Sequence, residues 1–423
     1  MVKKFGCFWL VLFTPCFAFA QEITNLTLQQ AYDLAYKNYP VWRQKDLVRR
    51  TADLNIDILQ KDFLPQVTVV GQSTYQSAVT EVPIKIPGYT IEAPSKSQQK
   101  VVADLSQLIY DGGVTRQQKN FEDLNAVVED QKVEVELYQI KEKINLYYLG
   151  ILYMDEQLKQ VELVKSDIEN GIKRVEAQVQ NGTAFKSNLN SLKAELLEVD
   201  QRRIETRATK KGLVDAMAVF LGQPINENVQ LEKQVINNVV YGEITRPELK
   251  LYNDQSKLID QQNKLITARN RPKASLFAQG GYGRPGLNML VNEFDTYYIG
   301  GLRLNWSLDG LYKTKKEREK IEVNKKIVDT EKETFLLTTN TQLVRQQAEI
   351  EKLKQLIVSD SAIIALRRTV TDASKAQLES GVITATDYLI DVNAEDQARQ
   401  GLITHEVQLI QAQINYLTIS GKQ

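Results

Sequence analysis

The side chains that most often carry catalysis are nearly absent from this sequence. Its 423 residues contain one histidine, His405, and two cysteines, Cys7 and Cys16, both within the first twenty positions. Neither a nucleophile and base pair nor a zinc cluster built on His or Cys can be assembled from them. The sequence therefore predicts a protein that is not an enzyme, with no catalytic residues, no metal and no cofactor, and places His405 on a helix surface or seam.

Two other patterns resemble ligand sites. Gly280-Gly281-Tyr282-Gly283 looks like a phosphate loop, but it lacks the helix and lysine that must follow, so we interpret it as small residues at a strand end. The basic run 313–320, KTKKEREK, follows the last predicted strand and could bind anionic lipid headgroups. A solvated helix face with mixed i,i+4 charge pairs is the other interpretation. The 53 basic and 53 acidic residues balance, which argues against a nucleic-acid partner.

The first twenty residues differ from the rest of the chain. Lys3 and Lys4 precede an apolar run that ends in Ala18-Phe19-Ala20, a pattern typical of a secretory signal peptide with a small-residue cleavage site. An N-terminal transmembrane anchor, the rival interpretation, needs roughly 20 apolar residues. Residues 1–20 are therefore predicted to be a signal peptide, and Phe13-Thr14-Pro15 before Cys16 does not fit a lipoprotein signal. Beyond it no apolar run reaches 18 residues, so a membrane crossing would require a barrel.

A long helical stretch is the element that organises the rest of the chain. Between Asp111 and Gly182, apolar residues recur alternately three and four positions apart, with no proline. This heptad pattern indicates a helix that packs lengthwise against other long helices. At 1.5 Å per residue it would span about 107 Å, more than one globular core can bury.

Hairpins precede the long helices, and the pattern occurs twice. Alternation predicts strands at about 66–78 and 97–110, and again at about 273–282 and 296–308. Asp111-Gly112 recurs as Asp309-Gly310, and Gly182 recurs as Gly381, about 200 residues later. Residues 21–222 and 246–423 are therefore predicted to be tandem repeats, each a β-hairpin with long coiled-coil helices.

The segment 223–245 joins the two repeats. It is polar and broken by Pro224, with Asn226, Asn228, Asn237 and Asn238. We predict a belt around the middle of the helices, with a short irregular linker as the alternative.

The strands have one apolar and one polar face. We predict that the apolar face contacts lipid, because barrel strands in an outer membrane alternate in this way, with aromatic residues at the interfaces. Half-buried strands of a soluble sheet would alternate equally well. The barrel is favoured because the very long helices offer no second sheet to pack on. The predicted lipid-facing residues are Val101, Leu105, Leu302, Leu304 and Trp306.

Motifs along essentially the whole chain after residue 20 resemble those of the TolC-like outer-membrane efflux protein family. They are Leu26-Thr27-Leu28-Gln29-Gln30-Ala31, Asn38-Tyr39-Pro40, Leu64-Pro65, the run 304–310 (LNWSLDG), and Gly381 followed six residues later by Asp387. The resemblance implies a homotrimer in the bacterial outer membrane, with a twelve-stranded barrel continued by a periplasmic α-helical barrel. It further implies a passive exit duct of a tripartite efflux or type I secretion system, with a periplasmic adaptor (membrane fusion protein) and an inner-membrane transporter as partners.

Barrel geometry favours the same oligomer independently. Four strands cannot close and would leave two open edges in lipid. Two copies would give eight strands and a filled interior, whereas three would give twelve strands and room for a channel. A periplasmic coiled-coil adaptor or structural protein with a small soluble sandwich remains the alternative. A general porin is disfavoured because it has no use for about 100 Å of helix.

The far helix turns, at Gly182 and Gly381, are predicted to form the periplasmic gate. Asp387 and Asp391 are one turn apart on one helix face, so three copies would bring six carboxylates around one axis, a constriction that attracts cations. The segment 384–387 (TATD) also fits a capping box, which would explain Asp387 without a gate. Members of the family often carry an arginine two residues after the second tip glycine, where this chain has Ile383, and Lys186 is a possible substitute partner.

Overall fold

The structure is a computed structural model that describes residues 22–81, 83, 87–88, 93–233 and 242–422. The predicted signal peptide and Asn237 and Asn238 lie outside these residues. The chain divides into two compact units. Unit 1 comprises residues 1–42, 139–244 and 341–423, and unit 2 comprises residues 43–138 and 245–340.

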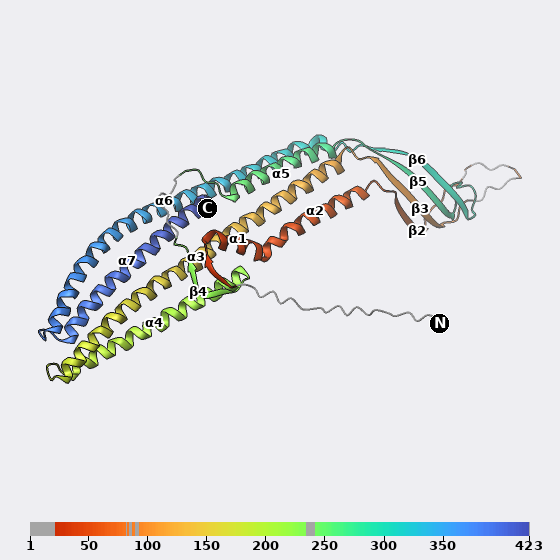
Figure 1. Cartoon of the computed structure of the whole chain (residues 1–423). Helices are drawn as coiled ribbons and strands as arrows, with labels where there is room; N and C mark the ends of the chain where they lie inside the picture. The colour runs from red at the N-terminus through yellow and green to blue at the C-terminus, as the bar shows by residue number, and fades with distance from the viewer. Residues whose placement is uncertain (1–21, 82, 84–86, 89–92, 234–241, 423) are drawn as a thin grey trace, which may run out of the picture. The chain divides into compact units, whose positions relative to one another are not determined.

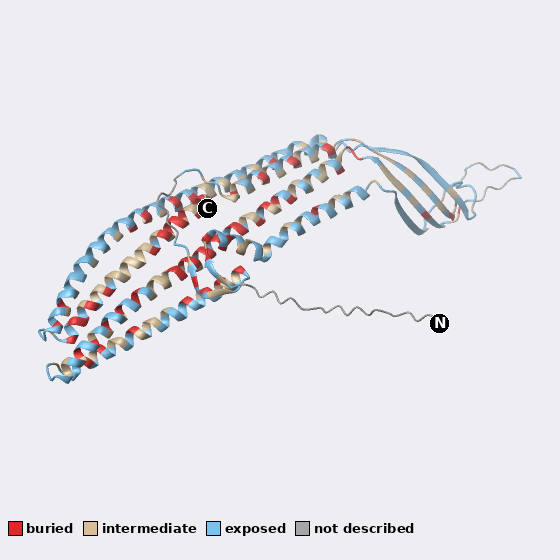
Figure 2. Ribbon diagram, in the orientation of Figure 1, coloured by how far each residue is buried: buried red, intermediate tan, exposed pale blue. Residues whose placement is uncertain are grey.

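Two very long helices run through both units (Figure 1). Helix α3, Val114–Gln180, has 67 residues and α6, Gly310–Glu379, has 70, so each is about 100 Å long. The apolar seam of α3 is buried at Leu137, Ile144 and Ile151. This confirms the lengthwise packing that the heptad pattern predicted, and Figure 2 shows the buried residues as stripes along the helices.

Unit 2 contains a four-stranded antiparallel sheet in the order β2-β3-β5-β6. The strands are β2 (Gln66–Tyr75), β3 (Ser97–Tyr110), β5 (Lys273–Arg284) and β6 (Asp295–Asn305). Helices α2 (Gln44–Lys61) and α5 (Pro247–Arg269) and the first parts of α3 and α6 complete the unit.

Three predicted strand ends are wrong, because in each case the partner strand determines where the pairing ends. Strand β2 stops at Tyr75 because its partner β3 begins at Ser97, which pairs with Tyr75. Strand β6 stops at Asn305 because its partner β5 begins at Lys273, directly after Pro272. Strand β5 runs beyond the predicted residue 282 because Arg284 still pairs with Gln99 of β3.

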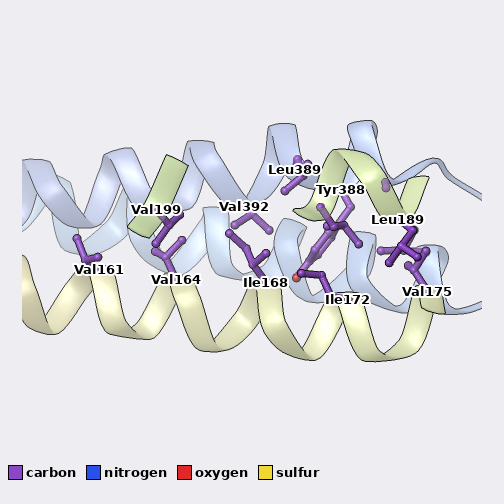
Figure 3. Packing of buried hydrophobic residues seen from close by; sticks show 13 residues of the cluster. Val161, Val164, Ile168, Ile172, Val175, Leu189, Val199, Tyr388, Leu389 and Val392 are labelled. Atoms are coloured by element: carbon purple, nitrogen blue, oxygen red, sulfur yellow. The ribbon is translucent and has the colours of Figure 1, made fainter. Parts of the chain in front are cut away.

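In the residues of unit 1 that the structure describes, all elements are helical apart from one small sheet. Its elements are β1 (Ile23–Leu26), α1 (Leu28–Asn38), the 3-10 turn Pro40–Arg43 at its border, α4 (Lys186–Leu221), β4 (Ile225–Leu231), α7 (Ala385–Ser420) and the remaining parts of α3 and α6. Thr27 caps α1 in a capping box with Gln30. Apolar side chains from α3, α4, α6 and α7 meet near the helix turns (Figure 3). Ile168, Leu192 and Tyr388 of this cluster are almost fully buried.

The segment between residues 223 and 245 is not wholly irregular. Strand β4 pairs in parallel with β1, and Leu26 faces Leu231 across the pair. The Tyr148 hydroxyl of α3 lies 3.0 Å from the Leu26 carbonyl oxygen and 2.8 Å from that of Glu232. The alternative of an irregular linker is therefore wrong for residues 225–231, and β1 was not predicted, whereas the belt around the helices stays a prediction.

Candidate functional site: the sheet faces and the helix turns

The strand register places the predicted lipid-facing residues of β3 and β6 on one side of the sheet. Leu105 pairs with Ala278 and Val101 with Tyr282, while Leu302 and Leu304 pair with Leu276 and Ala274. Directly paired residues share a face, so these side chains form one apolar surface together with Val67 and Val69 of β2. Leu302 and Leu304 are 66% and 71% exposed. The apolar face is therefore open to solvent in the single chain.

The opposite face of the sheet carries the polar groups. Gln279 Nε2 donates to Asp104 Oδ1 over 2.7 Å, and the Arg303 guanidinium lies 4.7 Å from the Phe277 ring centroid. Thr68 pairs with Asp104, and Arg303 with Ser275. A sheet with one apolar and one polar face can separate lipid from water.

Trp306 departs from its predicted place in a strand. It lies one residue beyond β6, and its indole Nε1 donates to the Asn270 carbonyl oxygen over 3.0 Å. The side chain is still 60% exposed. Trp306 therefore marks the junction of sheet and helix, because no strand residue is left opposite it to continue the ladder.

Both predicted tip glycines end their helices in the left-handed conformation. Gly182 has φ +75° and Gly381 has φ +72°. Thr183 N donates to Gln178 O over 2.8 Å, and Val382 N donates to Gln377 O over 2.9 Å. These bonds satisfy the last helix carbonyls, as in a Schellman turn, so each turn reverses the chain into α4 or α7.

Asp387 adopts the capping role. Its Oδ2 accepts from Thr384 N over 3.0 Å, and its own amide donates to Thr384 Oγ1 over 3.2 Å. Hydrogen bonds from the Thr384 side chain and backbone hold the pKa of this carboxyl below its usual value. The carboxylate is exposed at the start of α7, so capping does not withdraw its charge from solvent.

Asp391 and Lys186 lie differently from their predicted pairing. Asp391 is half-buried and accepts a hydrogen bond from Ser374 Oγ of α6, while its carbonyl lies 3.3 Å from Thr371 Oγ1. Lys186, exposed at the first residue of α4, forms no ion pair with either acid in the part of the chain that the structure describes. The structure thus does not join Lys186 to the two acids.

Sequence reasoning missed the contacts that connect the two helix turns. Arg174 of α3 forms an ion pair with Glu379 of α6, and Gln178 Nε2 donates to the Glu379 carbonyl over 2.9 Å. The partners lie about 200 residues apart, so no local spacing could have indicated them.

A buried polar cluster lies farther from the turns. Asp396 of α7, with a side chain 5% exposed, accepts from Arg202 Nη1 of α4 over 2.8 Å and from Gln160 Nε2 of α3 over 3.0 Å. Tyr388 of the same helix is also buried, and this burial raises the pKa of its phenol to about 12. A buried carboxylate with charged and amide donors fixes how three helices pack.

His405 lies on the seam between α7 and α6. Its Nδ1 lies 2.6 Å from Asp360 Oδ2, between α7 and α6. Within the described ranges there is no group of His, Cys, Asp or Glu that could hold a metal ion. Over the same residues, no helix is both long and apolar enough to cross a membrane.

Solved structures of outer-membrane channels share this fold. The channel OprN matches with a TM-score of 0.67 at 13% identity, covering 94% of this chain and 90% of its own. CusC matches with a TM-score of 0.67 at 13% identity, covering 95% and 93%. The open-state MtrE channel of Neisseria gonorrhoeae matches with a TM-score of 0.66 at 13% identity, covering 93% and 89%.

Sequence comparison alone finds less. No protein-family model matches the chain, and no curated protein matches it. The structural neighbours are channel proteins and not enzymes. This mainly helical chain with its four-stranded sheet therefore has the fold of TolC-like outer-membrane efflux channels, to which its motifs are also similar.

Proposed function

We propose that the protein is an outer-membrane exit duct, a passive conduit from a periplasmic adaptor and inner-membrane transporter to the cell exterior. The observation that carries the proposal is the sheet of unit 2, with a continuous exposed apolar face, a polar face and two edges that pair with no other described strand. Such a sheet is stable in lipid only when its edges are closed by other copies. The channel neighbours support the same role.

A homotrimer closes this sheet. Strands β2 and β6 are the open edges, and three copies supply the twelve strands of a barrel with an aqueous interior. The helices of unit 2 follow the same order, because α2 contacts α3 through Asn55 and Glu122, α3 contacts α5 through Gln117 and Gln261, and α5 contacts α6 through Asp260 and Lys325.

Helices α2 and α6 each leave an apolar seam exposed. On α2 it includes Leu47 and Ile58, 65% and 61% exposed, and on α6 it includes Val323 and Leu337, 56% and 70% exposed. Two unlike surfaces that meet head to tail generate a ring when the rotation closes. The seams therefore suit an α6 to α2 contact between neighbouring copies, continued in the periplasm as a helical barrel.

Channel formation is the deciding experiment. Purified protein should run as a heat-stable trimer in detergent gels and should give discrete single-channel conductance in planar bilayers. A periplasmic adaptor or structural protein with a soluble sheet would give neither result. Monomeric protein with no conductance would reject the duct.

We place the periplasmic gate at the turns that contain Gly182 and Gly381, with Asp387 and Asp391 as its acidic rings. Three copies of two carboxylates around one axis would attract cations. Replacing Asp387 and Asp391 with asparagine preserves hydrogen-bond acceptors for Thr384 and Ser374 while removing the charge. The double variant should show weaker block by multivalent cations and higher conductance than the parent. Unchanged block by multivalent cations would place the acidic rings elsewhere. The Lys186→Gln variant tests whether Lys186 is a partner of these acids in the gate.

A further inference from the structure

The junction between the sheet and its helices carries a concentrated positive charge. Segments 264–273 and 309–320 contain nine lysines and arginines but only three acids, in a chain whose formal net charge is zero. All nine side chains are exposed. We name this set the basic patch: Lys264, Arg269, Arg271, Lys273, Lys313, Lys315, Lys316, Arg318 and Lys320.

The two segments form one surface within unit 2. Arg318 Nη2 donates to Thr267 Oγ1 over 3.2 Å, and Asn270 Nδ2 donates to Thr314 Oγ1 over 2.7 Å. These bonds connect the last turns of α5 to the first turns of α6. The nine cations therefore combine into a single local field.

Internal pairing neutralises little of this charge. Lys313 pairs with Asp309 over 2.8 Å and Lys316 with Glu319 over 2.6 Å. Among the described residues no ion pair involves Arg269, Lys315 or Lys320. A solvated helix face with i,i+3 and i,i+4 pairs accounts for two of the nine cations and leaves the others unexplained.

Two of the unpaired cations line the same groove. Arg269 of α5 and Lys320 of α6 line a groove of about 510 Å³ together with Phe121, Leu265 and Ile321. A single phosphate group could be held by both side chains, since guanidinium and ammonium groups bind phosphate strongly. Glu317 is the acid at this groove.

Exposed apolar and aromatic residues lie beside the basic patch. Trp306, Leu308, Leu311 and Tyr312 are 60%, 54%, 82% and 73% exposed. Aromatic residues concentrate at membrane interfaces, and clusters of four to eight basic residues next to a membrane segment bind anionic headgroups. The sequence from 306 to 320 thus passes from an interfacial apolar surface to a basic one.

We propose that the basic patch binds the phosphate headgroups of anionic glycerophospholipids in the leaflet next to the helix-bearing end of the sheet. The proposal rests on the proposed function, because it requires the sheet to lie in a bilayer. Charge complementarity selects the anionic lipid, and the neighbouring aromatic surface selects a bilayer over a dissolved anion.

The test compares lipid binding to the intact protein and to two matched variants. The patch variant is Arg269→Gln, Lys315→Gln and Lys320→Gln. The control variant is Lys143→Gln, Lys354→Gln and Arg367→Gln, which removes the same charge from exposed positions of α3 and α6 in unit 1. Binding of phosphatidylglycerol and of phosphatidylcholine to each detergent-purified protein is measured by native mass spectrometry.

Parent and control should prefer phosphatidylglycerol, and the patch variant should bind it about tenfold or more weakly with phosphatidylcholine binding unchanged. Arg269→Lys, Lys315→Arg and Lys320→Arg should retain binding. Equal phosphatidylglycerol binding by patch variant and control, or displacement of the lipid by millimolar inorganic phosphate, would overturn the proposal. Conductance in pure phosphatidylcholine bilayers tests the duct separately, because it needs no anionic lipid.

Discussion

Single residues on the sheet have consequences that depend on which face they occupy. Leu302 lies on the apolar face of the sheet. Ile299, on the same strand, lies on the polar face, at the same level of the strand register as Asp104. Leu302→Arg should therefore destabilise the inserted protein by roughly 2–4 kcal/mol if it lies near the bilayer centre, whereas Ile299→Arg should be much milder.

Yield of folded protein in vesicles, read by heat-modifiable gel mobility, measures this difference. Gly301 would be a poor polar-face control, because a Cβ there would lie 3.2 Å from the Phe277 ring. Equal losses for Leu302→Arg and Ile299→Arg would contradict the assigned faces.

Tyr388 gives a residue-scale prediction about pH. Burial raises its pKa to about 12, whereas an unfolded phenol ionises near 10. The folded protein therefore keeps the proton longer than the unfolded chain, and the stability this contributes is present below pH 10 and is lost as pH rises toward 12.

Tyr388→Phe should remove this dependence. Between pH 10 and 12 the thermal midpoint of the parent should fall more than that of the variant. Differential scanning calorimetry in detergent can follow this difference. Other ionising groups affect both proteins equally. A constant difference across that range would show that folding does not raise the pKa of Tyr388.

At the scale of elements, the helix ends are fixed by backbone geometry more than by contacts. Gly381 has φ +72°, and a Cβ added to it would meet nothing within 4 Å. Gly222 has φ +69°, and a Cβ added there would overlap the Asn38 side chain. Gly381→Ala should cost about 1–2 kcal/mol from the left-handed backbone alone. Gly222→Ala should cost more, because Asn38 must also move.

Thermal unfolding of the two variants tests this order. Gly212, inside α4 with open space around it, is the matched control, and Gly212→Ala should stabilise the protein by about 0.5–1 kcal/mol. A larger loss at Gly381 than at Gly222 would argue against the close approach of Asn38 to the end of α4.

At the scale of the whole molecule, ring closure between copies is the central prediction. Cysteine at Val70 of the edge strand β2, combined with cysteine at Ile299 or Arg303 of the edge strand β6, should give covalent trimers in at least one combination. The only native cysteines, Cys7 and Cys16, lie in the predicted signal peptide, so the background should be low. Non-reducing gels read the outcome.

The control places the first cysteine at Val102 of β3, an interior strand paired on both sides. It should give no cross-linked ladder with the same β6 positions. Cross-linking from Val102, or none from Val70 in any combination, would contradict pairing of β6 with β2 of a neighbouring copy.

The sequence by itself determined the elements and their faces. Heptad spacing defined the long helices, since a helix that packs lengthwise must repeat its apolar side every three or four residues. Strand alternation assigned Val101, Leu105, Leu302 and Leu304 to one face, because a two-residue period fixes which side each Cβ takes. The sequence also indicated the capping box of Thr384 and Asp387, because its two partners are three residues apart.

Only the tertiary structure decided what depends on residues far apart in the chain. The ends of β2 and β6 follow from where their partner strands begin, which places Trp306 outside the sheet. The parallel pair of β1 and β4, the Arg174 to Glu379 ion pair and the hydrogen bond from Ser374 to Asp391 join different elements. Local periodicity carries no signal for such contacts, because they depend on how helices and strands pack after they form.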